Sequence, residues 1–238
     1  MKFYYLVAAY NEEDVLARTI HDLAIIPERF PGSEVLILVN GSSDRTWQIA
    51  QTLSEENSNW VTSYHNTEKG MGVAFKRGLR ELLEKRHLGT DDWIVFCASD
   101  LPFGFSDLES FLKMSSKDRQ DNVLFVGSKS HPQSKVERNW KRKLGSKFFE
   151  IARRLILNIK TRDTQGSLFL RGEQVSIVEK LKSNDYFITA EIVYFAEKIG
   201  MVTEMPVHLR SEIRNSKISL IKDGCKSLLQ LLKIRLDR

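Results

Sequence analysis

Apolar runs of strand length alternate with segments of helical period through the first part of the chain. The apolar runs are Phe3–Ala9, Glu34–Val39, Trp60–His65 and Trp93–Ser99. Segments of helical period separate them, at about residues 12–25, 44–54 and 72–85. Consecutive strands that are separated by helices pair in parallel through right-handed crossovers, which cover both faces of the sheet. The alternation therefore predicts an α/β fold with a mainly parallel central sheet and helices on both faces.

The second part of the chain adds further elements to this pattern. We expect strands at Asn122–Ser128, about Ser167–Leu170 and about Met201–Val207. We expect helices at about Val136–Leu157, Gly172–Leu181 and Thr189–Ile199. A chain of 238 residues without a linker-like tract of Pro, Gly and Ser indicates a single domain. Its two cysteines, Cys97 and Cys225, exclude a Cys-rich zinc site and fit a reducing compartment.

The sequence does not predict a segment that crosses a membrane. No window approaches the roughly 20 consecutive apolar residues that a spanning helix requires. The N-terminal run is a poor signal peptide, because acidic residues follow from Glu12 and no small-residue cleavage site appears. We therefore expect a cytoplasmic protein.

The positive charge of the chain is concentrated in one segment. Lys and Arg number 36 against 31 Asp and Glu, a formal net charge of +5. Residues Ser128–Lys160 alone hold ten basic side chains and two acidic ones. Such a segment suits a phosphate-rich partner, namely nucleic acid, an anionic bilayer or a phosphorylated substrate, although a solvated helix face explains it equally well. Nucleic acid is disfavoured, because no basic motif with interleaved aromatic residues accompanies the segment.

Polar clusters follow three of the expected strands. They are Tyr10–Glu13, Asn40–Asp44 and Ser99–Asp100. The carboxyl ends of parallel strands meet at the edge of the sheet where ligands bind. Helix capping also explains each cluster by itself, with Asn11 as one N-cap and Ser42 or Asp44 as another. What favours a binding site is that these clusters occur together with further polar motifs, in one order along the chain.

That order of motifs resembles glycosyltransferase family 2, in particular its dolichyl-phosphate mannose synthase and polyprenyl-phosphate glycosyltransferase branch. The similar segments are AAYNEE, NGSSDRT, KGMGVAFKRGL, CASDLPF, VGSKSHP, RDTQGSLFLR and the stretch from ITAEIV to PVHLR. They extend from about Phe3 to Lys217. The resemblance implies a GT-A (Rossmann-like) domain over residues 1–217, with a nucleotide-binding half at about 1–127 and an acceptor half at about 128–217. An amphipathic helix over 218–238 follows.

The resemblance also implies a reaction and a set of site residues. The reaction is transfer of a hexose, with inversion, from GDP- or UDP-hexose to a lipid phosphate, helped by Mg²⁺ or Mn²⁺. The residues expected to bind the nucleotide-sugar are Ala9, Tyr10, Glu12, Asn40, Asp44, Lys69, Ser99 and Asp100. The residues expected to act on the sugar and the acceptor are Asp100, Asp163, Gln165, Arg210 and Lys217, with Lys129 as a further phosphate contact. Asp100 is also the expected metal ligand.

Three positions depart from the family pattern. Asn40 replaces the aspartate that reads the base, Ala98 replaces the first carboxylate of the metal-binding motif, and Pro102 replaces its glutamine. Because hard divalent cations are held by oxygen ligands and neutralised by carboxylates, we expect weak or dispensable metal use. The departures also support an alternative, a catalytically degenerate subunit that binds nucleotide or lipid phosphate.

The C-terminal segment, residues 218–238, repeats leucine and isoleucine among Lys and Arg. An interfacial helix on an anionic bilayer has this composition, and so does a helix that packs on the domain or on a partner. Together with the basic segment, it leads us to expect a protein that is peripheral on the cytoplasmic membrane face. Its partner there is an anionic membrane surface or a membrane-anchoring subunit.

Overall fold

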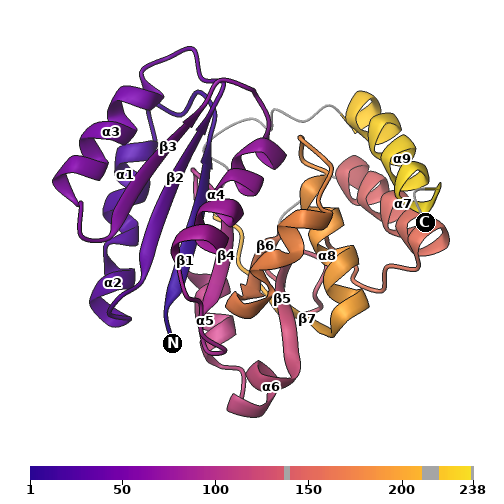
Figure 1. Cartoon of the computed structure of the whole chain (residues 1–238). Helices are drawn as coiled ribbons and strands as arrows, with labels where there is room; N and C mark the ends of the chain where they lie inside the picture. The colour runs from indigo at the N-terminus through magenta and orange to yellow at the C-terminus, as the bar shows by residue number, and fades with distance from the viewer. Residues whose placement is uncertain (137–139, 211–219, 237–238) are drawn as a thin grey trace.

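A seven-stranded sheet forms the centre of the molecule (Figure 1). The structure is a computed structural model that describes residues 1–136, 140–210 and 220–236, with only the backbone described at 140–144 and 220–225. The strands are β1 (Phe3–Ala9), β2 (Glu34–Asn40), β3 (Val61–Asn66), β4 (Trp93–Ala98), β5 (Asn122–Ser128), β6 (Ser167–Arg171) and β7 (Met201–Pro206). Their order in the sheet is β3-β2-β1-β4-β6-β5-β7. All pairings are parallel except those of β6 with β4 and β5.

Helices cover both faces of this sheet, as the alternating pattern predicts. One face packs against α1 (Leu16–Leu23), α2 (Ile25–Arg29), α3 (Thr46–Glu56) and α5 (Ser106–Leu112). The other packs against α4 (Met71–Lys85), α7 (Trp140–Leu157), the 3-10 helix η1 (Gly172–Lys180), α8 (Ile188–Ile199) and α9 (Leu220–Leu236). The short α6 (Ser116–Asp121) leads into β5. The predicted α/β fold with a mainly parallel sheet is therefore confirmed.

Strand β1 shows why the strands read as continuous apolar runs. All seven of its residues are buried. Tyr4, Leu6 and Ala8 belong to one core, whereas Phe3, Tyr5, Val7 and Ala9 belong to the other. Successive side chains of a strand point to opposite faces, so a strand between two helical layers needs apolar residues at every position.

The reversed direction of β6 determines which loops meet. Six strands end at one edge of the sheet within the described residues, and their loops follow there. Because β6 is antiparallel, it begins at that same edge, and the residues before it lie there too. Asp163–Gly166 is therefore brought to the edge where β1, β2 and β4 end.

The expected start of the first helix was wrong. The helix begins at Leu16, and Val15 occupies its N-cap position without a side-chain cap. Asn11 instead adopts a left-handed backbone conformation, with φ 51°. Its side-chain Oδ1 accepts a hydrogen bond from the backbone N–H of Ser43, 2.8 Å away. The polar residues after β1 therefore bind the neighbouring loop and do not cap a helix.

Two further differences concern short elements. The helix expected at 172–181 is the 3-10 helix η1, and helices α5 and α6 were not predicted. The last two have 7 and 6 residues, too few for a helical period to stand out in the sequence. Elsewhere the predicted strands agree with the observed ones to within a residue or two.

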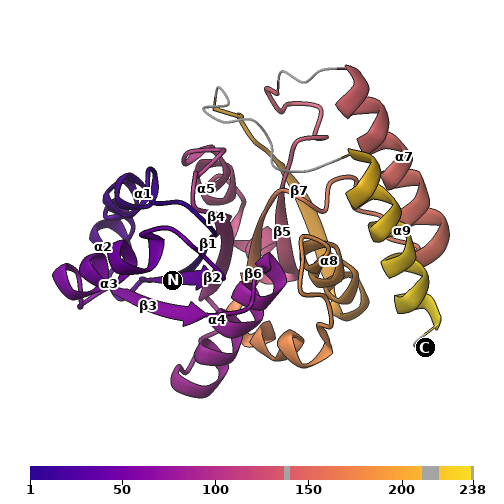
Figure 2. The ribbon, with the colours of Figure 1, turned by 90° about the horizontal axis from the view of Figure 1, so that it is seen from above.

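Helices α7 and α9 lie side by side at the end of the molecule farthest from α1–α3 (Figures 1 and 2). Leu231 of α9 is completely buried in the core beneath them. Near the C-terminal ends of both helices, the guanidinium of Arg235 donates to the carbonyl of Ile156 at 2.6 Å. The helices therefore run in the same direction. Among the described residues, no helix is long and apolar enough to cross a membrane.

Candidate active site

The Asn40 side chain holds together the loops at the carboxyl ends of three strands. Its amide nitrogen donates to the carbonyl of Ala9 at 3.0 Å, and its amide oxygen accepts from the N–H of Gly70 at 3.0 Å. The residue is 3% exposed. Asn40 therefore orders this edge of the sheet from within, while its contact with a base stays a prediction.

The loops after β1 and β2 are joined by a second set of hydrogen bonds. The N–H of Glu12 donates to Thr46 Oγ1 at 2.8 Å, and that of Glu13 donates to Asp44 Oδ2 at 3.3 Å. Partial burial raises the pKa of Asp44, but hydrogen bonds from Thr46 and Glu13 outweigh this effect and leave the pKa below its ordinary value. Asp44 is thus an ionised carboxylate that holds the two loops together, while its part in nucleotide binding stays a prediction.

Tyr10 and Lys69 border a cavity of about 300 Å³ at this edge. The ammonium of Lys69 lies 4.0 Å from the centre of the Tyr10 ring, a cation–π contact. The remaining lining residues come from the loop before α8 and from α9: Asp185, Tyr186, Phe187, Lys226 and Ser227. The cavity therefore combines aromatic surfaces with two ammonium groups, which suits a ligand that has a ring and negative charge.

The far wall of this cavity is fixed by Asp185. Its carboxylate accepts from Lys226 Nζ at 2.6 Å and from Gln230 Nε2 at 3.1 Å. Partial burial raises the pKa of Asp185, but these bonds outweigh it and leave the pKa below the ordinary value. Helix α9 is thereby attached to the loop that lines the cavity.

Close backbone approach explains two glycines of the KGMG motif. The N–H of Gly72 donates to the carbonyl of Asn184 at 3.0 Å. A Cβ added to Gly72 would lie 2.3 Å from the carbonyl oxygen of Ser183, and one added to Gly70 would lie 2.0 Å from that of Asn184. The start of α4 therefore contacts the 183–184 segment directly, and no larger residue fits at either position.

Asp100 and Arg210 lie on or beside the loop that follows β4. Asp100 is exposed, whereas Ser99 is buried and its carbonyl accepts a hydrogen bond from Thr19. The backbone N–H of Arg210 donates to the carbonyl of Pro102 at 2.9 Å, and its guanidinium is 3.6 Å from Asp22. The segment after β7 is therefore anchored on the Asp100 loop, as expected if both contribute to one site.

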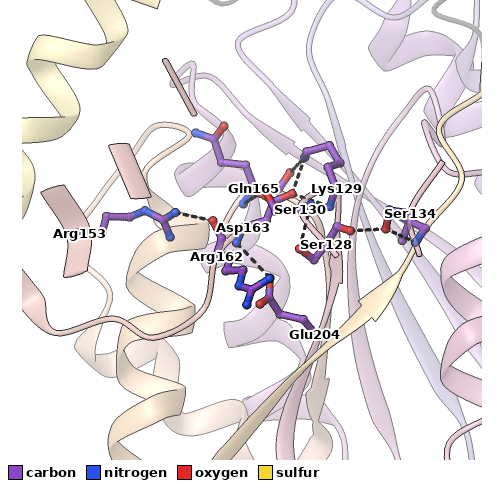
Figure 3. Close-up of polar contacts among 10 residues, drawn as sticks. Ser128, Lys129, Ser130, Ser134, Arg153, Arg162, Asp163, Gln165 and Glu204 are labelled. Carbon is purple, nitrogen blue, oxygen red and sulfur yellow. Dashed lines mark hydrogen bonds and ion pairs between the residues drawn. The ribbon is translucent and has the colours of Figure 1, made fainter. Parts of the chain in front are cut away.

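Asp163, a predicted catalytic residue, is held by several polar contacts (Figure 3). Its Oδ2 accepts from the N–H of Lys129 at 2.8 Å and lies 3.4 Å from the Lys129 ammonium. Its Oδ1 accepts from the N–H of Gln165 at 2.9 Å. Its own N–H donates to Glu204 Oε1 at 3.2 Å. The residue is 8% exposed. These contacts hold its carboxylate where β5, β6 and β7 meet.

Arg153 supports this carboxylate from behind, reaching in from α7 (Figure 3). It is 3% exposed, and its guanidinium donates to the carbonyls of Thr161 at 3.4 Å and Arg162 at 2.9 Å. Burial lowers the pKa of Arg153, an effect that the charges of Asp163 and of nearby glutamates oppose. One nitrogen, Nε, has no hydrogen-bond partner among the described atoms.

Sequence reasoning missed several of these residues. Arg153 was counted only as part of a basic segment, and the three glutamates that hold loops of the site from α8 and β7 were not singled out. Glu191 accepts from the backbone of Lys182 and Ser183, Glu197 accepts from that of Lys160 and Thr161, and Glu204 accepts from Asp163. Of these residues, only Glu191 could have been found from the sequence, because it is a carboxylate in a largely apolar helical segment. Lys217, a predicted phosphate contact, lies outside the described residues.

The residues present do not form a self-sufficient metal centre. Among the described residues, no three His, Cys, Asp or Glu side chains gather closely enough to hold a metal ion. Ala98 stands where a second carboxylate would be, beside Asp100. The role of Asp100 as a metal ligand therefore stays a prediction.

The geometry agrees with a comparison to known families. A model of the family described as Glycosyl transferase family 2 matches residues 5–176. The chain belongs to this family. This confirms the family that the motifs indicated, and the matched range includes the Asn40 and Asp163 loops.

Two curated relatives cover most of the chain. Glycosyltransferase AglD of Haloferax volcanii is 25% identical over 225 residues, which are 92% of this chain and 34% of that protein. The chain thus spans about a third of that relative. Undecaprenyl-phosphate mannosyltransferase of Micrococcus luteus is 25% identical over 226 residues, which are 92% of this chain and 88% of that protein.

Solved structures show that the fold is GT-A. Glucosyl-3-phosphoglycerate synthase from Mycobacterium tuberculosis, in complex with Mn²⁺, UDP-glucose and phosphoglyceric acid, has a TM-score of 0.67 at 16% identity, covering 99% of this chain and 80% of that one. Mannosyl-3-phosphoglycerate synthase from Rubrobacter xylanophilus has a TM-score of 0.65 at 14% identity, covering 100% and 74%. By family and by fold, the chain is therefore a glycosyltransferase.

Proposed function

We propose that the chain transfers a hexose from a nucleoside-diphosphate sugar to a polyprenyl-type lipid phosphate, with inversion at the anomeric carbon. The observation that carries the proposal is the meeting of two sets of loops at one sheet edge. Tyr10, Lys69 and Asp100 follow the parallel strands, and Asp163 precedes the antiparallel β6. The name of the Micrococcus luteus relative supports a lipid phosphate acceptor and a mannosyl donor.

The chemistry needs little from a general base. A phosphate oxygen is anionic at neutral pH, so it attacks the anomeric carbon directly and forms the new C–O bond. The bond to the nucleoside diphosphate breaks, and that group leaves with the electron pair. The protein's task is to position both reactants and to stabilise the leaving charge.

The predicted residues that reach this edge can be placed in this scheme. Tyr10 and Glu12 contact the nucleoside, and Lys69 meets the diphosphate charge. Asp163 and Gln165 face the sugar and the acceptor, and Lys129 and Arg210 meet phosphate charge. A bound Mg²⁺ or Mn²⁺ would add charge stabilisation at the diphosphate, where Asp100 would contact it. Since no second carboxylate is present at Ala98, the cations of the site supply part of that stabilisation.

A transfer assay tests the proposal. The chain is incubated with GDP-mannose, UDP-glucose and other nucleotide-sugars in turn, with a short-chain polyprenyl phosphate, in Mn²⁺ or in EDTA. We expect one donor to yield a glycosylated lipid phosphate of inverted anomeric configuration, with only a partial loss of rate in EDTA. Asp163→Asn should lower kcat by about 100-fold, the usual effect of removing one positioned polar group from an active site.

The degenerate-subunit alternative rests on Asn40, Ala98 and Pro102, and the described part of the chain adds no group of side chains that could hold a metal ion. It predicts that calorimetry detects nucleotide binding while no donor is transferred or hydrolysed with any metal. That combination of results would replace the enzymatic proposal. A lipid acceptor also requires contact with a bilayer. That this contact is made on the cytoplasmic face of a membrane stays a prediction.

A further inference from the structure

Exposed large apolar side chains gather on α7 and α9. Each helix presents three of them at positions i, i+3 and i+7, with exposures between 46% and 83%. They are Phe148, Ile151 and Leu155 on α7 and Leu229, Leu232 and Leu236 on α9. Most other large apolar side chains of the described residues are buried or lie singly on the surface. Such a concentration on two adjacent helices marks an interaction surface.

The exposed residues of each helix flank the side that packs on the core. On α7, each exposed residue directly precedes one that packs on the core, namely Phe149, Ala152 or Ile156. On α9 the order is reversed, because Leu229 and Leu232 directly follow the packed Leu228 and Leu231. One residue turns a helix by about 100°, so each stripe is turned away from the core. The two helices lie side by side and run in the same direction (Figure 2), so both stripes belong to one helix pair.

The charge of the two helices is predominantly positive. By sequence, α7 and α9 together carry ten basic residues and two acidic ones, Glu150 and Asp223. Arg154 and Lys233 are exposed directly beside Leu155 and Leu232. Long basic side chains next to exposed leucines keep their charge at a surface while their stems and the leucines lie in an apolar phase. This arrangement complements anionic headgroups above an acyl boundary.

We propose that α7 and α9 form one face that inserts its six apolar side chains into the surface of an anionic bilayer. The inference concerns attachment and stands apart from the transfer reaction, but it gives the proposed lipid phosphate a route to the site. Ser227 and Lys226 of the same α9 line the cavity beside Tyr10. The helix that lies on the membrane thus also borders the candidate donor site.

Vesicle flotation with the full chain tests this face. Vesicles of phosphatidylcholine, with or without an equal amount of phosphatidylglycerol, are mixed with protein at low and high salt. We expect binding to the anionic vesicles that weakens with salt, because screening acts on the charge component. The double variant Leu155→Ser/Leu232→Ser should bind about tenfold more weakly, since binding scales with inserted apolar area. Met201→Ser is the matched control, because Met201 is 56% exposed and lies elsewhere, on β7.

Several outcomes would overturn the proposal. Equal binding of the wild type to both vesicle types, or no binding to either, would do so. Unchanged binding of a double variant that keeps the wild-type circular dichroism and Tm would also do so. If light scattering shows a dimer that the double variant abolishes, the face binds a second copy of the chain instead. Transfer to a water-soluble acceptor phosphate is measured in parallel with the wild type. If the wild type binds anionic vesicles but transfers no sugar, the result counts against the proposed function alone.

Discussion

Arg153 shows how a single buried residue can set the geometry of a site that it does not enter. Its guanidinium donates to the two backbone carbonyls that directly precede Asp163. The charges of Asp163 and of three glutamates, Glu150, Glu197 and Glu204, oppose its own. A buried charge without its partners is strongly destabilising. We therefore infer that Arg153 is a positioning residue, which would act on the proposed reaction through Asp163.

Substitutions of Arg153 separate positioning from stability. Arg153→Met leaves the nearby carboxylates without their cation and should cost about 3 kcal/mol of unfolding free energy. Arg153→Lys keeps the charge but loses the forked geometry that reaches both carbonyls. We expect the lysine variant to stay folded with a lower kcat and a nearly unchanged KM for the donor. A fall in Tm without any change in kcat would reduce Arg153 to a structural role.

At the scale of elements, the Asp185 carboxylate attaches α9 to the loop that lines the cavity, through an ion pair with Lys226 and a hydrogen bond from Gln230. Asp185→Asn should loosen α9 while costing only about 0.5–1 kcal/mol, since Lys226 is largely exposed. We expect faster hydrogen exchange in α9, unchanged exchange in the central strands and a higher donor KM. Lys233→Met, on the outer side of α9, is the control, and equal exchange in both variants would contradict the idea.

The effect of this ion pair on stability depends on pH in a defined direction. The pKa of Asp185 is lower in the folded protein than its ordinary value of 3.8. The stabilisation is therefore complete above that value and is lost as the pH falls through the lowered pKa of the folded state. At neutral pH the pair is fully formed, so Asp185→Asn has its whole effect there.

The elements of this fold differ in how far the sequence predicts them. Strands such as β1 were predictable because burial on both faces requires an apolar residue at every position. The reversal of β6 was not, because Ser167–Arg171 has the same apolar pattern as a parallel strand. The helix assumed to start near Asn11 failed because tertiary hydrogen bonds to the β2 loop determine that segment.

The candidate site shows the same division. The loops after β1, β2 and β4 were predictable, because the carboxyl ends of parallel strands meet at one edge. Asp163 and Gln165 were reached only through a family resemblance, since no local pattern distinguishes the turn before β6. The roles of Arg153, Glu204 and Asp185 depend on contacts between segments distant in sequence, and these appear only in the folded chain.

On the scale of the whole molecule, the two proposed halves share one sheet and its cores. Strand β4 pairs with β1 on one side and with β6 on the other, and one core extends from Tyr4 to Leu231. Removing the acceptor half would expose the edge of β4 and much of that core. The division at about residue 127 is therefore one of function, in the proposed scheme, within a common packing unit.

We expect the chain to unfold in urea as one unit. Tryptophan fluorescence and far-UV circular dichroism should give coincident transitions, because the cores connect both halves. A fragment of residues 1–127 should remain unfolded or aggregate through its exposed β4 edge. Two separated transitions, or a fragment with native-like circular dichroism and a cooperative melt, would show that the halves are independent domains.

The reversed strand β6 makes one short stretch of the chain intolerant of any change in length. Phe169 points into one core, and Leu168 and Leu170 point into the other. A shift of the strand by one residue would therefore turn each of these side chains into the opposite core. A Cβ added to Gly166, which precedes the strand, would lie 1.8 Å from the carbonyl oxygen of Gly127. An inserted or deleted residue between Asp163 and Leu170 would therefore displace the proposed catalytic carboxylate and disorder both cores at once.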